Sequence, residues 1–231
     1  MKKLTMLVSA LALSTAVMAQ KPTEGAPVSL EGQISLIGGG GGTNLNFVAP
    51  ALRLRYFVTD NIAIRLTVGL NNNKTTRNVF EFADGTGGAG KYTTKNSMTN
   101  IALGAEYHFK GTERLSPYAG LDIGFGMGGA KEDGTNATQA PSLLYIANYT
   151  EKYTAKSSMF GVNLVAGTDF YFAKNFYIGL ELGVGFSATT WKNAVRETTN
   201  AGAIVKTVKP ETKQSSFANN FIGSFRLGWR F

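Results

Sequence analysis

The sequence predicts an all-β protein: a transmembrane, eight-stranded, antiparallel up-and-down β-barrel preceded by a cleavable signal peptide. Three observations favour this fold class. Segments along the whole chain alternate apolar with small or polar residues, as strands do between lipid and a polar lumen. The last segment, residues 221–231, alternates in this way and ends the chain on an aromatic residue. Beyond residue 19 no apolar run approaches the ~20 residues of a membrane-spanning helix.

The N-terminus has the layout of a secretory signal peptide. Lys2 and Lys3 precede an apolar run over residues 4–16, and Ala19 supplies a small residue at the expected cleavage site. We therefore expect residues 1–19 to be removed, residues 20–28 to form a polar periplasmic tail and residues 29–231 to form the barrel. A short membrane anchor helix is the alternative, which the short apolar run disfavours.

Composition limits the possible chemistry and partners. The chain has no cysteine, which excludes disulfides, thiol catalysis and thiolate metal sites. Its formal net charge of +8 becomes +6 once Lys2 and Lys3 leave with the signal peptide. We expect no nucleic-acid partner, because the chain is exported and has no recognition motif. No cofactor site is indicated, and the glycine run 38–42 lacks the Gly-Lys-Ser/Thr ending of a phosphate-binding loop.

The first four predicted strands each have one apolar face with period 2. These faces are Leu30, Ile34 and Leu36 in 29–37; Leu52, Leu54, Tyr56 and Val58 in 50–58; Ile62, Ile64, Leu66, Val68 and Leu70 in 62–70; and Ile101, Leu103, Ala105, Tyr107 and Phe109 in 100–109.

The last four predicted strands follow the same rule. Their apolar faces are Ala119, Leu121, Ile123, Phe125 and Met127 in the fifth; Phe160, Val162, Leu164, Ala166, Phe170 and Phe172 in the sixth; Phe176, Ile178, Leu180, Leu182, Val184 and Phe186 in the seventh; and Phe221, Phe225, Leu227, Trp229 and Phe231 in the eighth. Each strand has about the ten residues that a tilted strand needs to cross the hydrocarbon layer.

Connections between these strands alternate in length. We expect short ones at 59–61, 110–116 and 173–175, and long loops at 38–49, 71–99, 128–158 and 187–218. Short turns face the periplasm in this class and long loops face outward, so both termini should be periplasmic. Aromatic residues gather at the short-turn ends, with a second group toward the long loops at Phe125, Phe160, Phe186 and Phe221, as expected of membrane interfaces.

The chain resembles the small eight-stranded outer-membrane barrels of Gram-negative bacteria, the type shared by the OmpA transmembrane domain and OmpX. The signal peptide, the eight alternating segments, the Tyr56–Asn61 turn and the terminal segment carry this resemblance. It implies a location in the cell outer membrane. It also implies that the terminal strand is the signal for the barrel-assembly machinery, through Phe225, Leu227, Trp229 and Phe231. No peptidoglycan-binding domain follows Phe231, so no cell-wall tether is expected.

Charged residues on the polar faces form the most informative group. Four acids and four bases lie at similar depth along their strands: Glu31, Arg53, Arg55, Arg65, Glu106, Asp122, Glu181 and Arg226. An eight-stranded barrel has an interior just wide enough for side chains, so charges at one depth should pair and plug the lumen. A charged ring lining a conducting pore is the alternative. Across the closing seam, Arg226 could pair with Glu31 or with Glu181.

We expect no enzymatic activity. His108 is the only histidine, and although Ser224 and Asp169 could lie near it, no nucleophile motif accompanies them. The predicted function is a structural or surface-interaction role in the outer membrane, and a narrow channel for small or apolar solutes is the alternative.

Membrane lipid and the phosphates of lipopolysaccharide are the expected partners of the basic outer segments, with simple solvated loops as the alternative, and the long loops could also bind an extracellular ligand. The bases in question are Lys74, Arg77, Lys91, Lys95, Lys192, Arg196, Lys206, Lys209 and Lys213.

Overall fold

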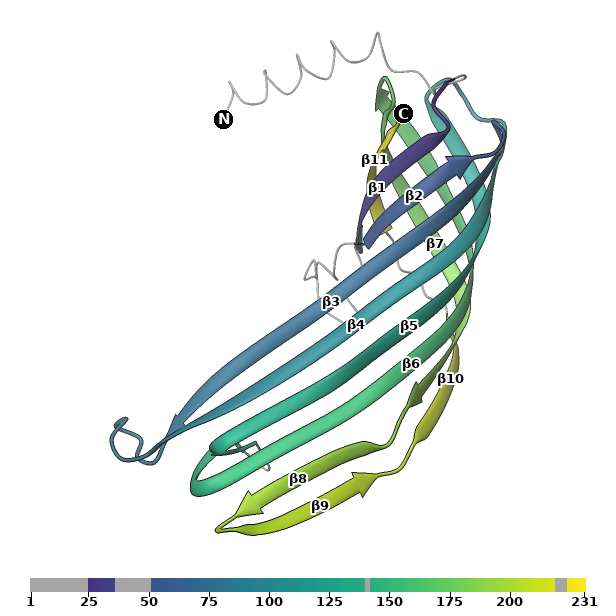
Figure 1. The fold of residues 1–231 in the computed structure, drawn as a ribbon. Coiled ribbons are helices and arrows are strands. Elements are labelled where there is room, and N and C mark those ends of the chain that lie inside the picture. The colour runs from purple at the N-terminus through teal and green to yellow at the C-terminus, as the bar shows by residue number, and fades with distance from the viewer. Residues whose placement is uncertain (1–24, 36–50, 140–141, 219–223) are drawn as a thin grey trace, which may run out of the picture.

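A computed structural model describes residues 25–35, 51–139, 142–218 and 224–231. Eight strands form an antiparallel barrel: β1 (Val28–Ser35), β2 (Ala51–Phe57), β3 (Ile62–Phe80), β4 (Ala89–His108), β5 (Leu115–Thr138), β6 (Leu144–Ala173), β7 (Phe176–Trp191) and β11 (Ser224–Arg230). Strands β1 to β7 pair in sequence order, and β11 closes the barrel by pairing with both β7 and β1 (Figure 1). The predicted fold class is thereby confirmed.

Side chains alternate between the two faces of the barrel as the sequence predicts. In β11, Leu227 and Trp229 are 54% and 46% exposed on the outside, whereas Arg226 is fully buried inside. The exposed apolar side chains form a belt around the barrel that includes Leu30, Leu54, Leu66, Leu103, Ile123, Leu164, Leu180 and Leu227. Such a belt is the surface that lipid covers in a membrane barrel. Within the described ranges, no helix is long and apolar enough to span a bilayer.

The prediction that residues 71–99 and 128–158 form long loops is wrong. Strands β3 and β4 stay paired as far as Phe80 and Ala89. Strands β5 and β6 stay paired to Thr138 and Leu144, with one register shift near Thr135. Only residues 81–88 and 139–143 remain as connections. These polar extensions contain many threonines and tyrosines, which favour strands. Outside the lipid both faces meet water, so no apolar alternation marks them in the sequence.

The expected loop at 187–218 is also mostly strand. It holds the end of β7 and then β8 (Ala194–Asn200), β9 (Ala203–Lys209) and β10 (Thr212–Ala218). Positive φ values at Ala201 and Gly202 shape the tight turn between β8 and β9. Strand β8 pairs with β6, and β10 pairs with β7. Strands β3 to β6, β8 and β9 therefore continue beyond the barrel as an open, curved sheet, named here the extension (Figure 1).

The opposite end of the barrel carries the short turns. The connections at 58–61, 109–114 and 174–175 lie there, and the C-terminus lies there too (Figure 1). Phe231 and Val28 exchange two backbone hydrogen bonds of 2.8 and 3.0 Å, which extend the closing seam to the last residue. Strand β5 begins at Leu115, two residues earlier than predicted, and this brings Ser116 and Tyr118 into the lumen. The predicted signal peptide, the glycine run 38–42 and Phe221 lie outside the described residues.

Candidate functional site

The eight charges predicted on the polar faces all point into the lumen. Side chains alternate between the two faces of a strand, and each of these charges lies on the face opposite to the lipid-facing residues of its strand. None is more than 8% exposed. They come from seven strands: Glu31 on β1, Arg53 and Arg55 on β2, Arg65 on β3, Glu106 on β4, Asp122 on β5, Glu181 on β7 and Arg226 on β11.

Glu106 holds two arginines together. Arg55 and Arg65 stand directly opposite each other on β2 and β3, an arrangement in which like charges repel. The Glu106 carboxylate accepts a hydrogen bond from Arg55 Nη1 at 2.8 Å and one from Arg65 Nη1 at 3.0 Å. A bridging anion thus turns a repulsive pair into an attractive cluster.

Two further carboxylates are bound at both oxygens. Arg65 donates to Asp122 Oδ1 at 2.7 Å and Oδ2 at 2.5 Å, and Arg53 donates to both oxygens of Glu181 at 2.9 Å. Such paired bonds between guanidinium and carboxylate are among the stronger hydrogen bonds in proteins. Arg65 Nη1 also reaches Glu181 at 2.8 Å, which joins the two pairs.

Arg226 carries the network across the closing seam. Of its two candidate partners, it pairs with Glu31, at 3.1 Å, while Glu181 is held by Arg53 and Arg65. A second partner is Asp169 on β6, at 2.6 Å. Gly179 stands opposite Arg226 in register, and a Cβ there would collide with its guanidinium. The glycine on β7 therefore makes room for the arginine on β11.

Sequence reasoning missed several members of this network. Asp169 pairs with Arg55 at 2.9 Å as well as with Arg226, although the sequence linked it only to His108. Tyr118, which the sequence analysis did not single out, donates to Glu181 at 2.5 Å. Tyr177 donates to Glu31 at 2.8 Å, in space left by the facing Gly228. The facing glycines were the signal for these tyrosines, since a missing side chain inside a filled barrel implies a large neighbour.

Aromatic side chains close the lumen between the charges and the short turns. Tyr171 and Tyr177 are fully buried, with ring centroids 5.2 Å apart. The Arg230 guanidinium lies 3.7 Å above the Phe57 ring, and its Nε donates to the carbonyl of Ala26 at 2.6 Å. Together these groups form a second layer between the charges and the short turns.

His108 lies in this second layer, and its ring nitrogens contact residues other than the Ser224 and Asp169 that the sequence suggested. Its Nδ1 is 2.8 Å from Ser116 Oγ, and its Nε2 is 3.0 Å from Glu106. A hydroxyl, an imidazole and a carboxylate in series are the parts of a nucleophilic site. Here all three are at most 2% exposed, and Glu106 already binds two arginines. The contacts therefore serve to fix the interior.

On the outer side of the charges the lumen is open. A cavity of about 470 Å³ lies there, lined by small and polar residues such as Thr67, Gly124 and Asn163. Asp122 and Glu181, the two least buried acids of the network, also line it. The lumen is thus filled at one end and roomy at the other.

Comparisons with known proteins agree with this architecture. The model of the putative OmpA-OmpF-like porin family matches residues 46–194, well over half of the chain. No curated protein matches the sequence. Among solved structures, the chain is similar to the N-terminal β-barrel domain of Pseudomonas aeruginosa OprF, with a TM-score of 0.39 and 15% identity over 90% of this chain and 100% of that chain.

Two other solved outer-membrane proteins are also similar to this chain. Ail of Yersinia pestis has a TM-score of 0.35 and 15% identity, covering 88% of this chain and 95% of its own. The outer-membrane protein AlkL has a TM-score of 0.32 and 13% identity, covering 92% of this chain and 94% of its own. On the family match, the closed barrel and its apolar belt, this chain belongs to the putative OmpA-OmpF-like porin family and is a β-barrel protein of the outer membrane.

Proposed function

We propose that this protein is a closed outer-membrane barrel with a structural or surface-interaction role, and that the charge network plugs its lumen. One observation carries the proposal: nine buried charged groups, the eight predicted ones and Asp169, form one connected set of ion pairs to which all eight barrel strands contribute. Pairs that join every strand hold the wall together from inside.

The energetics favour a plug over a pore. The interior of an eight-stranded barrel is just wide enough for side chains, so a solute could pass only if the network opened. Removing one partner from a buried pair leaves an unpaired charge, at a cost of about 3–5 kcal/mol. Opening a passage would break several pairs at once, and this cost disfavours spontaneous conduction.

Conductance in planar bilayers tests the proposal. The wild-type barrel should give no stable current steps, because the network and the aromatic layer beneath it leave no continuous path. The variant that combines Arg65→Ser and Glu181→Ser in the network with Tyr171→Ala and Tyr177→Ala in the aromatic layer opens both layers and should produce measurable current. Lys206→Ser, on exposed β9, is the control and should stay silent. Steady ohmic conductance of the wild type would refute the plug.

The cavity on the outer side of the charges supports a second candidate, a narrow channel or a binding chamber for small solutes. Its volume of about 470 Å³ would hold a small molecule, and polar residues such as Thr67 and Asn163 would contact it there. Uptake of small solutes by vesicles containing the barrel distinguishes the two candidates. Solute uptake at the same rate by the wild type and by Arg65→Ser would favour the channel.

The extension supports the surface-interaction part of the proposal. It places the turns at 81–88 and 201–202, and the strand ends at Thr138 and Leu144, far from the apolar belt, on a sheet whose edge strand β9 is exposed along its whole length (Figure 1). A ligand in the medium would meet these turns and this edge first. If a variant without residues 194–209 keeps an intact barrel but no longer binds a ligand at the cell surface, the extension is the binding surface for that ligand.

A further inference from the structure

A row of lysines crosses the extension just beyond the apolar belt. On the outer face, Lys74 lies four positions after Leu70, where the apolar alternation of β3 ends, and Lys131 lies four positions after Met127 of β5. Four residues of a strand tilted by about 45° rise roughly 9 Å. The headgroup layer of a bilayer is about 5–8 Å deep on each side. The backbone of the row therefore lies at the outer edge of the headgroup layer, and the long lysine side chains can reach headgroup phosphates from there.

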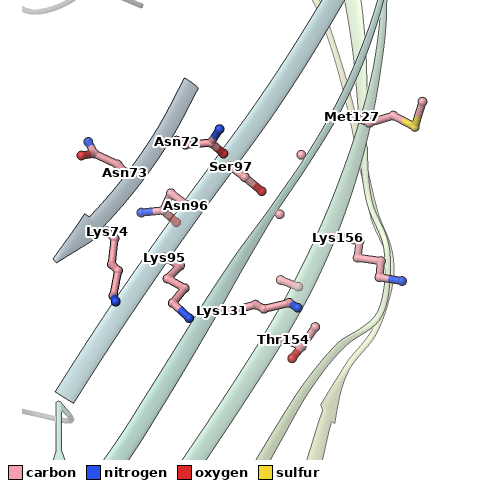
Figure 2. Close-up of a pocket in the computed structure, with 13 residues that line it drawn as sticks. Asn72, Asn73, Lys74, Lys95, Asn96, Ser97, Met127, Lys131, Thr154 and Lys156 are labelled. Carbon is pink, nitrogen blue, oxygen red and sulfur yellow. The ribbon is translucent and has the colours of Figure 1, made fainter. Parts of the chain in front are cut away.

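The register brings these lysines face to face. Lys74 on β3 is the direct partner of Lys95 on β4, and Lys95 is the direct partner of Lys131 on β5. All three side chains are exposed, and they follow one another across the three strands (Figure 2). Like charges directly opposite each other destabilise a sheet. Three in a row on neighbouring strands is thus an unfavourable arrangement in the protein alone.

The lumen shows how the same problem is solved elsewhere in the molecule. Arg55 and Arg65 are also direct partners, and Glu106 bridges them at 2.8 and 3.0 Å. In the described part of the chain, no carboxylate lies within 4.0 Å of the ammonium groups of Lys74, Lys95 or Lys131. The row lacks the anion that such a cluster needs.

A groove accompanies the lysine row. It has a volume of about 560 Å³, and residues of β3, β4, β5 and β6 line it (Figure 2). Lys156 of β6 adds a fourth ammonium group, Asn72, Ser97 and Thr154 supply hydrogen-bonding groups, and the 73% exposed Met127 lies at the membrane side. Cations, polar groups and an apolar end in one groove match a charged amphiphile in an upright orientation.

We propose that this groove binds the phosphorylated sugar headgroup of an outer-leaflet glycolipid, with its phosphates on Lys74, Lys95 and Lys131 and its acyl chains along the belt below Met127. Phosphate supplies the missing bridging anion. The neutral polar residues are suited to sugar hydroxyls, and the position next to the belt lets the acyl chains stay in lipid. This inference goes beyond the plugged lumen and holds whether or not the barrel conducts.

Binding of purified bisphosphorylated lipid A to the refolded barrel in neutral detergent tests the proposal. Each lysine near an anionic lipid surface contributes about a fivefold gain in affinity, so the triple variant Lys74→Gln, Lys95→Gln, Lys131→Gln should bind about 100-fold more weakly. The control has the same loss of charge at Lys110→Gln, Lys206→Gln and Lys209→Gln, all exposed and away from the groove, and should bind within about threefold of wild type.

A thermal-melting measurement supplies a second, independent readout. Without lipid, Lys95→Gln should raise the melting temperature, because it removes both repulsive contacts of the row. With saturating lipid A the same variant should melt below the wild type. This reversal of sign is not expected of a residue that only supports the fold.

Three results would overturn the proposal. One is triple-variant affinity within threefold of wild type, and another is equal weakening in the control variant. The third is phosphatidylglycerol vesicles binding as tightly as lipid A with the same dependence on the three lysines, since the groove would then be a general basic surface and not a glycolipid site.

Discussion

Single side chains hold the interior of this barrel together, and Arg226 shows this most clearly. It is fully buried, and its partners Glu31 and Asp169 come from β1 and β6. Its own strand, β11, is the last strand in the sequence. One guanidinium thus links the last strand to the first strand and to β6, beyond its neighbour β7.

Arg226→Ala should therefore destabilise the barrel strongly. The substitution leaves two buried carboxylates without this counter-charge, at a cost of about 3–5 kcal/mol in the free energy of unfolding. Unfolding of the refolded variant in urea, followed by tryptophan fluorescence, measures this loss. Lys206→Ala, on exposed β9, should change the free energy of unfolding by less than about 0.5 kcal/mol.

Adding Asp169→Asn to Arg226→Ala should recover part of the loss, because it reduces the excess of buried negative charge that the loss of Arg226 creates. Equal stability of Arg226→Ala and Lys206→Ala would show instead that water reaches the lumen charges and screens them.

Among the elements, β11 has the largest consequence for assembly. Its register with β1 and β7 closes the barrel, and Phe231 completes the seam through two backbone bonds to Val28. The Phe231 ring packs on Trp229 at a centroid distance of 4.8 Å and is 44% exposed toward lipid.

Deletion of Phe231 should impair insertion while leaving export intact, since the last seam bonds and the terminal aromatic group are both lost. The fraction of chain in the outer membrane that resists unfolding in cold detergent measures insertion. Phe231→Tyr keeps the ring and the backbone bonds, so it should insert normally. A deletion variant that inserts as well as the wild type would argue against Phe231 as part of the assembly signal.

The strands that the sequence predicted contact lipid on one face, whereas the strands that it missed lie beyond the membrane. Inside the membrane one face meets lipid and the other meets the lumen, so strands such as 62–70 alternate sharply and can be recognised. Beyond the membrane neither face of β3 to β6 meets lipid, and residues 71–78 are polar throughout. Without an apolar face, a strand cannot be distinguished from a loop by periodicity.

The lumen charges were predictable as residues, but apart from Arg226 with Glu31, one of two predicted candidates, their pairs were not. Their face follows from period 2, but partners such as Arg226 and Asp169 lie on β11 and β6, which are not adjacent in the sheet. That contact depends on side chains crossing the lumen, which sequence spacing does not specify.

At the scale of the whole molecule, the unequal ends of the barrel predict its orientation. The short turns and the C-terminus lie at one end, and the extension leaves from the other (Figure 1). Short turns face the periplasm in this class of protein. The extension should therefore project from the cell surface.

Single cysteines test this orientation directly, because the chain has none of its own. On intact cells, a membrane-impermeant maleimide should label cysteines at Thr86 and Ala201, in turns of the extension, but not at Asp60 or Lys174. After cell lysis all four should react. Labelling of Asp60→Cys on intact cells would reverse the topology. Gly134, in the predicted loop 128–158, is unsuitable as a further probe site, because it is buried within β5.

The nearly continuous pairing of β5 with β6 has a mechanical consequence. One ladder runs from Leu115 and Phe170 near the short turns to Thr138 and Leu144 at the far tip, and only the shift near Thr135 interrupts it. Strands paired in this way resist bending and shear as a single plate, so the tip has no hinge that would let it move alone. A force on the outermost turns would therefore be transmitted along the whole extension to the wall of the barrel. There the ion pairs across the lumen would resist deformation of the wall.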